Sequence, residues 1–159
     1  MKVRIVCVGK LKEKYLKEAI DEYKKRLGRY CSFDIIEVED EMAPDKLSPA
    51  LEERVKKTET DRILKQVRAG SFLVIMEVKG KRMSSEDFAK ELRTLAVDGI
   101  SDVTFVIGGS LGLHRDVMER ADLKFSMSDL TFTHQLARLI LIEQVYRAFK
   151  IIKGEPYAK

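Results

Sequence analysis

Apolar residues in this chain fall into short continuous runs that alternate with segments of helical spacing. The runs are rich in β-branched residues and end at glycine, proline or acidic clusters, which is typical of strands. Strands are predicted at 2–8, 33–38, 72–78 and 103–107, and helices at 13–29, 48–67 and after Ser84 or Ser85. Because these strands are apolar on both faces and separated by helices, the sequence predicts an α/β fold with a mostly parallel sheet and helices on both faces.

The third strand is expected to end in a turn at Lys79-Gly80-Lys81. Serine and proline predict the start of the second helix, since Ser48 suits an N-cap and Pro49 the first helical position.

The carboxy-terminal third carries the most distinctive pattern. The strand 103–107 stops at Gly108-Gly109-Ser110-Leu111-Gly112, and a short helix, 114–121, and a short strand, 123–127, follow. A polar loop, 126–134, then leads into a long final helix, 134–153. Two loops of this size at consecutive strand ends predict a ligand pocket at one edge of the sheet.

The final helix is apolar on more than half of its circumference. One stripe consists of Leu139, Ile142, Tyr146 and Phe149, and a neighbouring stripe of Leu141, Val145, Ala148 and Ile152. Such a helix must be covered from two directions. The sheet is one cover and a second subunit is a candidate for the other, so a homodimer is expected.

Composition sets limits on the class of protein. At 159 residues and 45% apolar, the chain suits one domain, 1–159, and its net charge of +4 comes from 30 basic and 26 acidic residues. That balance permits a polyanionic partner without requiring one. Cys7 and Cys31 are isolated and predict reduced thiols. No signal peptide or apolar span is recognisable, which indicates a cytoplasmic protein without a membrane association.

Several candidate groups have ordinary structural explanations. The glycine cluster matches neither the dinucleotide nor the triphosphate fingerprint, so a ligand-free turn remains open. His114 is expected to cap a helix or to be a polar surface histidine, and no metal site is expected because no acid or thiol stands at ligand spacing. Arg147 follows Glu143 by four residues, which predicts a surface ion pair. The tail after Gly154 is expected either to fray or to dock.

Three segments together resemble a known family over essentially the whole chain. They are Val8-Gly9-Lys10-Leu11-Lys12, the stretch from Phe105 to His114, and the stretch from Phe132 through Arg138 to Phe149, with the tail to Tyr157. The resemblance is to the ribosomal RNA large subunit methyltransferase H family. These SPOUT-class enzymes methylate N3 of a pseudouridine in 23S ribosomal RNA.

The resemblance implies a deep trefoil knot at the carboxy terminus, a homodimer, and S-adenosylmethionine as cofactor. By position it assigns cofactor contacts to Met76, Gly108, Met127, Ser128, Asp129, Leu130, Thr131 and Phe132. It also implies that the substrate is RNA in the assembled ribosome. The modest charge and the lack of a separate RNA-binding module agree with a large preformed target. The rival hypothesis is a non-catalytic nucleotide- or RNA-binding module in ribosome assembly.

For catalysis the resemblance points to Arg147 and Tyr157, with the tail reaching the active site of the partner. Ala158 stands where the family commonly has a histidine. The general base is therefore left open among His134, Tyr157 and solvent.

Overall fold

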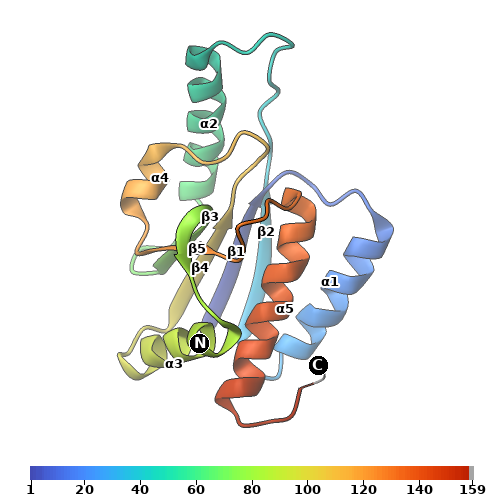
Figure 1. The fold of residues 1–159 in the computed structure, drawn as a ribbon, viewed down its shortest axis with the longest axis vertical. Helices are drawn as coiled ribbons and strands as arrows, with labels where there is room; N and C mark the ends of the chain where they lie inside the picture. The colour runs from blue at the N-terminus through green and yellow to red at the C-terminus, as the bar shows by residue number, and fades with distance from the viewer. Residues whose placement is uncertain (158–159) are drawn as a thin grey trace.

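The computed structural model describes residues 1–157. Its five strands are β1 (Lys2–Val8), β2 (Ser32–Val38), β3 (Phe72–Arg82), β4 (Asp102–Ile107) and β5 (Leu123–Ser126). Its helices are α1 (Lys14–Leu27), α2 (Pro49–Leu64), α3 (Ser85–Val97), α4 (Arg115–Arg120) and α5 (His134–Ile152). The strands form one sheet in the order β2-β1-β4-β3-β5, and every pairing is parallel (Figure 1). The predicted α/β fold is confirmed.

Helices cover both faces of the sheet because alternate residues of each strand point to opposite sides. On β1, Ile5 and Cys7 pack into a core with α1, α3 and α5, whereas Val6 and Val8 pack into a second core with α2 and α4. Figure 1 shows α1, α3 and α5 together on one side of the sheet. Both cysteines are free thiols.

Short polar side chains fix where the helices start. Ser48 accepts a hydrogen bond from the Leu51 N–H and Ser84 from the Asp87 N–H, so both act as N-caps. His114 caps α4 by accepting from the Asp116 N–H, which is one of the two roles that the sequence predicted for it. Thr133 caps α5 through the Leu136 N–H. These local signals therefore determined the starts of four helices.

The expected turn at 79–81 is wrong, because β3 continues through it to Arg82. The pairing of β3 with β5 shifts register between Met76 and Lys81. A Cβ on Gly80 would lie 2.7 Å from the Lys124 carbonyl carbon. The glycine is needed because β5 approaches the backbone closely here. In the sequence alone, a glycine required for such a contact between strands looks the same as a glycine in a turn.

Helix α5 is covered by other helices of its own protomer, whereas the sequence suggested that a second subunit covers it. The helix packs on the sheet, and α1 and α3 flank it within the same protomer. Ile142 is 0% exposed, and Tyr146 packs against Tyr23 at a centroid distance of 5.9 Å. Neighbouring helices thus supply much of the second cover, although Leu136 and Ile151 remain exposed. The homodimer stays a prediction that needs other support.

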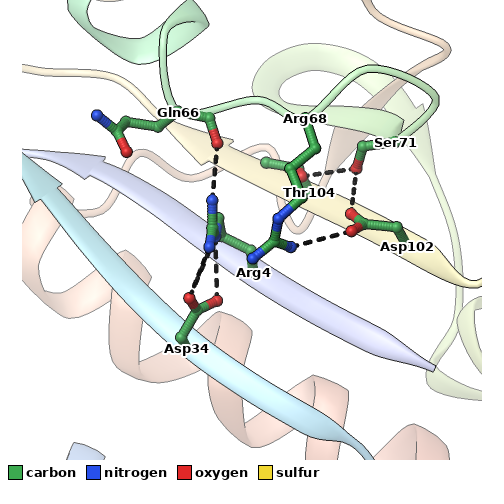
Figure 2. A network of polar contacts seen from close by, with 7 residues as sticks. All are labelled: Arg4, Asp34, Gln66, Arg68, Ser71, Asp102 and Thr104. Atoms are coloured by element: carbon green, nitrogen blue, oxygen red, sulfur yellow. Dashed lines mark hydrogen bonds and ion pairs between the residues drawn. The ribbon is translucent and has the colours of Figure 1, made fainter.

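A polar network crosses the sheet on the α2 side (Figure 2). Arg4 on β1 donates to both carboxylate oxygens of Asp34 on β2 and to the Gln66 carbonyl at 3.0 Å. Asp102 on β4 accepts from Ser71 at 2.6 Å and from Arg68 at 3.0 Å. The network joins three adjacent strands to the segment that follows α2.

We expect the Arg4→Ala variant to lower the free energy of unfolding by about 1–3 kcal/mol, because it leaves the Asp34 carboxylate and the Gln66 carbonyl without their donor. Arg82→Ala is the matched control, since Arg82 and its partner Asp129 are both exposed and such pairs contribute about 1 kcal/mol or less. Urea denaturation of both variants measures the difference. Equal losses of unfolding free energy in the two variants would show that the network around Arg4 stabilises the fold no more than an exposed ion pair does.

Candidate functional site

A cavity of about 520 Å³ opens beside the middle of β3, at Met76 to Val78, and at the carboxyl ends of β4 and β5. Its wall combines apolar side chains with glycine backbone and hydroxyl groups. The lining includes Met76, Ile107, Gly108, Gly109, Ser110, Gly112, Leu113, Phe125, Ser126, Met127, Ser128, Leu130, Thr131, Phe132, Thr133, His134 and Ala137. A concave, mostly apolar site with a few polar groups is typical of small-molecule pockets.

The glycine loop after β4 is folded back on itself. Gly109 and Gly112 form an antiparallel bridge, and Gly112 has a φ of +87°, a conformation that favours glycine. A Cβ on Gly108 would lie 2.9 Å from Leu113 Cγ, so this glycine permits close packing inside the loop. The Thr60 hydroxyl accepts from the His114 N–H and ties the end of the loop to α2. The loop is therefore held in one shape by its own packing and by its link to α2.

The second loop, 126–133, is held by short-range hydrogen bonds. The Ser126 hydroxyl donates to the Ser128 carbonyl, and the Ser128 hydroxyl accepts from the Leu130 N–H, both at 3.0 Å. Leu130 projects at the rim with 70% of its surface exposed. An exposed leucine on a cavity rim offers apolar surface to a ligand.

Seven of the eight residues predicted to contact a cofactor line this cavity: Met76, Gly108, Met127, Ser128, Leu130, Thr131 and Phe132. Asp129 is not among the lining residues, and its carboxylate forms an exposed ion pair with Arg82. The structure thus brings together nearly all of the predicted contacts and places Asp129 beside them.

A second cavity, of about 730 Å³, adjoins the first. The two share Gly109, Ser110 and His134 as lining residues. The remaining wall comes from the ends of β1 and β2 and from α2, and it includes Lys10, Lys12, Glu37, Glu39, Asp40, Glu41 and Glu59. The shared residues form a partition between an apolar cavity and a charged one.

His134, the first residue of α5, stands at this partition. Burial, followed by the positive charge of Arg138, lowers the pKa of His134 below its ordinary value of 6.5. Its imidazole is therefore neutral near pH 7 and able to accept a proton. Among the three candidate bases, His134 is the side chain that the structure places at the cavities.

Arg147 and Tyr157 lie elsewhere in the protomer. Arg147 follows His134 by thirteen residues, which is about 20 Å along the helix axis. The Arg147 guanidinium lies 4.4 Å from the centre of the Tyr157 ring and 3.0 Å from Glu143, as the ion-pair interpretation predicted. The Tyr157 hydroxyl donates to Glu143 at 2.7 Å, so the tail is docked. Burial, and then the Glu143 hydrogen bond, raise the pKa of Tyr157, which keeps the phenol protonated.

Position 158, where the sequence departs from the family pattern, lies outside the described residues. Within residues 1–157, no group of acids, histidines and cysteines is arranged to hold a metal ion. No helix in the same range is long and apolar enough to cross a membrane.

Known proteins match this chain over essentially its whole length. The family model described as "Predicted SPOUT methyltransferase" matches residues 1–158. The chain belongs to this methyltransferase family. Proteins named ribosomal RNA large subunit methyltransferase H are 57% identical in Acetivibrio thermocellus, over 99% of both chains, and 54% identical in Desulforamulus reducens, over 100% of this chain and 99% of that one.

Solved structures agree on the fold of this SPOUT methyltransferase. The tRNA (m1G37) methyltransferase of Aquifex aeolicus superposes with a TM-score of 0.53 at 15% identity, over 100% of this chain and 75% of that one. A probable methylase family protein from Haemophilus influenzae gives 0.52 at 14% identity, over 99% and 70%. Membership in the family implies a methyl donor and a deep trefoil knot at the carboxy terminus.

Three residues of this SPOUT methyltransferase that line or support the cavities were not predicted from the sequence: Arg138, Glu37 and Glu59. Arg138 is 1% exposed and donates to Glu37 at 2.6 Å and to the Gly9 carbonyl at 3.3 Å. Glu59, on α2, is 5% exposed and lines the second cavity. One signal was present for Arg138, because it stands three and four residues before the buried Leu141 and Ile142, on the apolar face of α5.

The lowered pKa of His134 predicts a pH dependence of stability. The unfolded chain binds the proton more tightly than the folded one, so the free energy of unfolding falls as pH drops through 6.5 toward the folded pKa. We expect His134→Gln to lose less stability than the wild type between about pH 7.5 and about pH 5, by less than about 1 kcal/mol. Urea denaturation at both pH values measures this, and identical losses would contradict it.

Proposed function

We propose that this protein is an S-adenosylmethionine-dependent methyltransferase that methylates N3 of a pseudouridine in large-subunit ribosomal RNA, acting in the cytoplasm on the assembled ribosome. The observation that carries the proposal is the cavity beside β3 and the ends of β4 and β5, where seven of the residues expected to hold the donor converge. Full-length similarity to proteins named for ribosomal RNA methylation supports the target.

The cavity suits the donor chemically. An adenosine has a flat apolar face and an edge of hydrogen-bonding groups. Phe132, Leu130 and Met127 offer apolar surface for the face, and the backbone of the glycine loop offers amides and carbonyls for the edge.

When bound, S-adenosylmethionine supplies an activated methyl group on a positive sulfur. The protein therefore has to position the nucleophile and remove one proton. We infer that the neutral His134 imidazole accepts the N3 proton of the base. The N3 lone pair would then be free to take a methyl group, which a donor held by the residues of the first cavity would supply while keeping the electron pair of its carbon–sulfur bond.

The Arg147 and Tyr157 cluster is too far along α5 to act on the cavity of its own protomer, so we propose that it acts on a second copy in a homodimer. The cluster presents a guanidinium and a protonated phenol, which bind phosphate or stabilise a developing anion. Arg147 also forms an ion pair with Glu143, and an ion pair of this kind at a surface contributes little to stability.

We expect Ala137→Phe to reduce the affinity for S-adenosylmethionine at least about tenfold, because a phenyl ring at this position would occupy the cavity. The change sits on a helix and leaves both loops untouched. Ala96→Phe on α3, at an exposed position away from the cavity, is the matched control. Isothermal titration calorimetry of both variants measures the effect.

Unchanged donor affinity in Ala137→Phe would place the donor elsewhere. Absence of donor binding by the wild type would instead favour a non-catalytic RNA-binding module.

The Arg147→Ala variant is expected to lose methyl transfer to ribosomes while its donor affinity stays near that of the wild type. A mixing experiment then tests the dimer. Arg147→Ala keeps an intact cavity and Ala137→Phe keeps an intact tail, so random exchange of subunits should restore about a quarter of the wild-type rate.

The rate is measured as incorporation of labelled methyl groups into ribosomes that lack the modification. No recovery on mixing, with both variants folded and exchanging, would show that Arg147 acts within its own protomer. Full activity of Arg147→Ala alone would return Arg147 to the role of a surface ion pair.

A further inference from the structure

Glu59 is a buried carboxylate that the chemistry described so far does not use. It lies on α2 with 5% of its surface exposed, and it lines the second cavity. Its Oε2 accepts a hydrogen bond from the Glu41 N–H at 3.0 Å. Its Oε1 accepts no hydrogen bond from another residue within 1–157, and it is not one of the fully enclosed polar atoms of this range, so it is open to the cavity. An accessible carboxylate oxygen without a donor from the protein is free to accept a hydrogen bond from a bound molecule.

The position of Glu59 next to the glycine loop is built into the fold. A Cβ on Gly109 would lie 3.0 Å from Glu59 Oε1 and 3.2 Å from Val8 Cγ1, so the glycine lets the loop backbone approach the carboxylate. The next residue, Thr60, accepts the hydrogen bond from the His114 N–H. Helix α2 thus holds Glu59 against the same loop that lines the donor cavity. Burial raises the pKa of Glu59, in keeping with an enclosed carboxyl group.

The second cavity has the size and position of an acceptor site. At about 730 Å³ it falls within the usual range of ligand pockets, and it meets the donor cavity at Gly109, Ser110 and His134. Lys10 and Lys12 are exposed where they line it, which suits phosphates outside the cavity. The acids of its wall do not form a metal site among the described residues. An organic ligand with hydrogen-bond donors fits it better than an ion.

We propose that the second cavity receives the base of the target nucleotide and that the Glu59 carboxyl group accepts a hydrogen bond from its N1–H, which selects pseudouridine over uridine. This inference rests on the proposed function, because it assumes methylation at N3 of a pseudouridine.

The structure of the base makes the selection possible. Pseudouridine is joined to its sugar through C5, so N1 and N3 both carry hydrogen and flank the C2 carbonyl. A base that enters with its sugar outward presents N1–H on one side and N3–H on the other. The cavity offers Glu59 from α2 and His134 from the partition. Uridine is joined through N1 and places a C5–H where pseudouridine has N1–H. A carboxylate facing that C–H would be desolvated without a donor, a type of mismatch that sites reject strongly.

The test compares ribosomes that carry pseudouridine at the target position with otherwise identical ribosomes that carry uridine. We expect kcat/KM of the wild type to be roughly 10- to 100-fold higher for pseudouridine. In Glu59→Gln, the side-chain oxygen can keep the hydrogen bond from the Glu41 N–H, and the NH2 group then faces the cavity. A donor would meet the N1–H donor, so the ratio between the two ribosomes should fall to about one.

Three controls separate selection from structure. Glu52→Gln makes the same change on the same helix outside the cavity and should leave the ratio at its wild-type value. Affinity for S-adenosylmethionine should stay unchanged in Glu59→Gln. If that variant does not fold, Glu59→Asp keeps the charge, withdraws the carboxyl by one methylene, and should also lower the ratio.

Several outcomes would overturn the inference while leaving the proposed function intact. One is a wild type that methylates both ribosomes equally well. Another is a folded Glu59→Gln, or Glu59→Asp, that retains the wild-type ratio. A third is an equal loss on both ribosomes, which would make Glu59 a structural residue. A wild type that methylates neither ribosome would instead contradict the proposed function itself.

Discussion

The buried guanidinium of Arg138 is the constraint on which the site depends. It joins the start of α5 to Glu37 at the end of β2 and to the Gly9 carbonyl after β1, and Glu37 also accepts from the Leu11 N–H. Burial raises the pKa of Glu37, but the hydrogen bonds from Arg138 and Leu11 outweigh it and hold that pKa below its usual value. The pair is therefore charged, and loss of one partner would leave an uncompensated buried charge. A buried ion pair is weak evidence of stability, but here it fixes geometry.

That geometry sets the two cavities beside each other. Arg138 lies one helical turn after His134, so anchoring it places the imidazole at the partition. There burial lowers the pKa of His134, and the positive charge of Arg138 lowers it further. The first cavity, which we propose binds the donor, is apolar and lined by two loops, whereas the second, which we propose receives the target base, is charged and backed by α2. The polar network around Arg4 joins neighbouring strands to the segment that follows α2, on the face of the sheet that α2 covers (Figure 2). A rigid sheet thus carries loops whose positions are fixed at both ends.

The sequence predicted the features that depend on local pattern. Strand runs, helical spacing, and the caps at Ser48 and His114 act within a few residues. The resemblance assigned donor contacts to eight residues, and seven of them line one cavity. Features that depend on distant residues were missed. Gly80 looked like a turn because its need for close approach comes from Lys124 on another strand. Arg138 and Glu37 are 101 residues apart in the chain. The cover that α1 and α3 provide for α5 likewise depends on tertiary packing that periodicity cannot reveal.

We propose that a donor cavity and an acceptor cavity meet at His134. A crystal structure of the protein with bound S-adenosylmethionine is the decisive test of this arrangement. We expect adenosine between the two loops, beside Leu130 and Phe132, with the sulfonium methyl directed across the partition toward the cavity that contains Glu59. Donor density in the second cavity, or a methyl group turned away from His134, would contradict it.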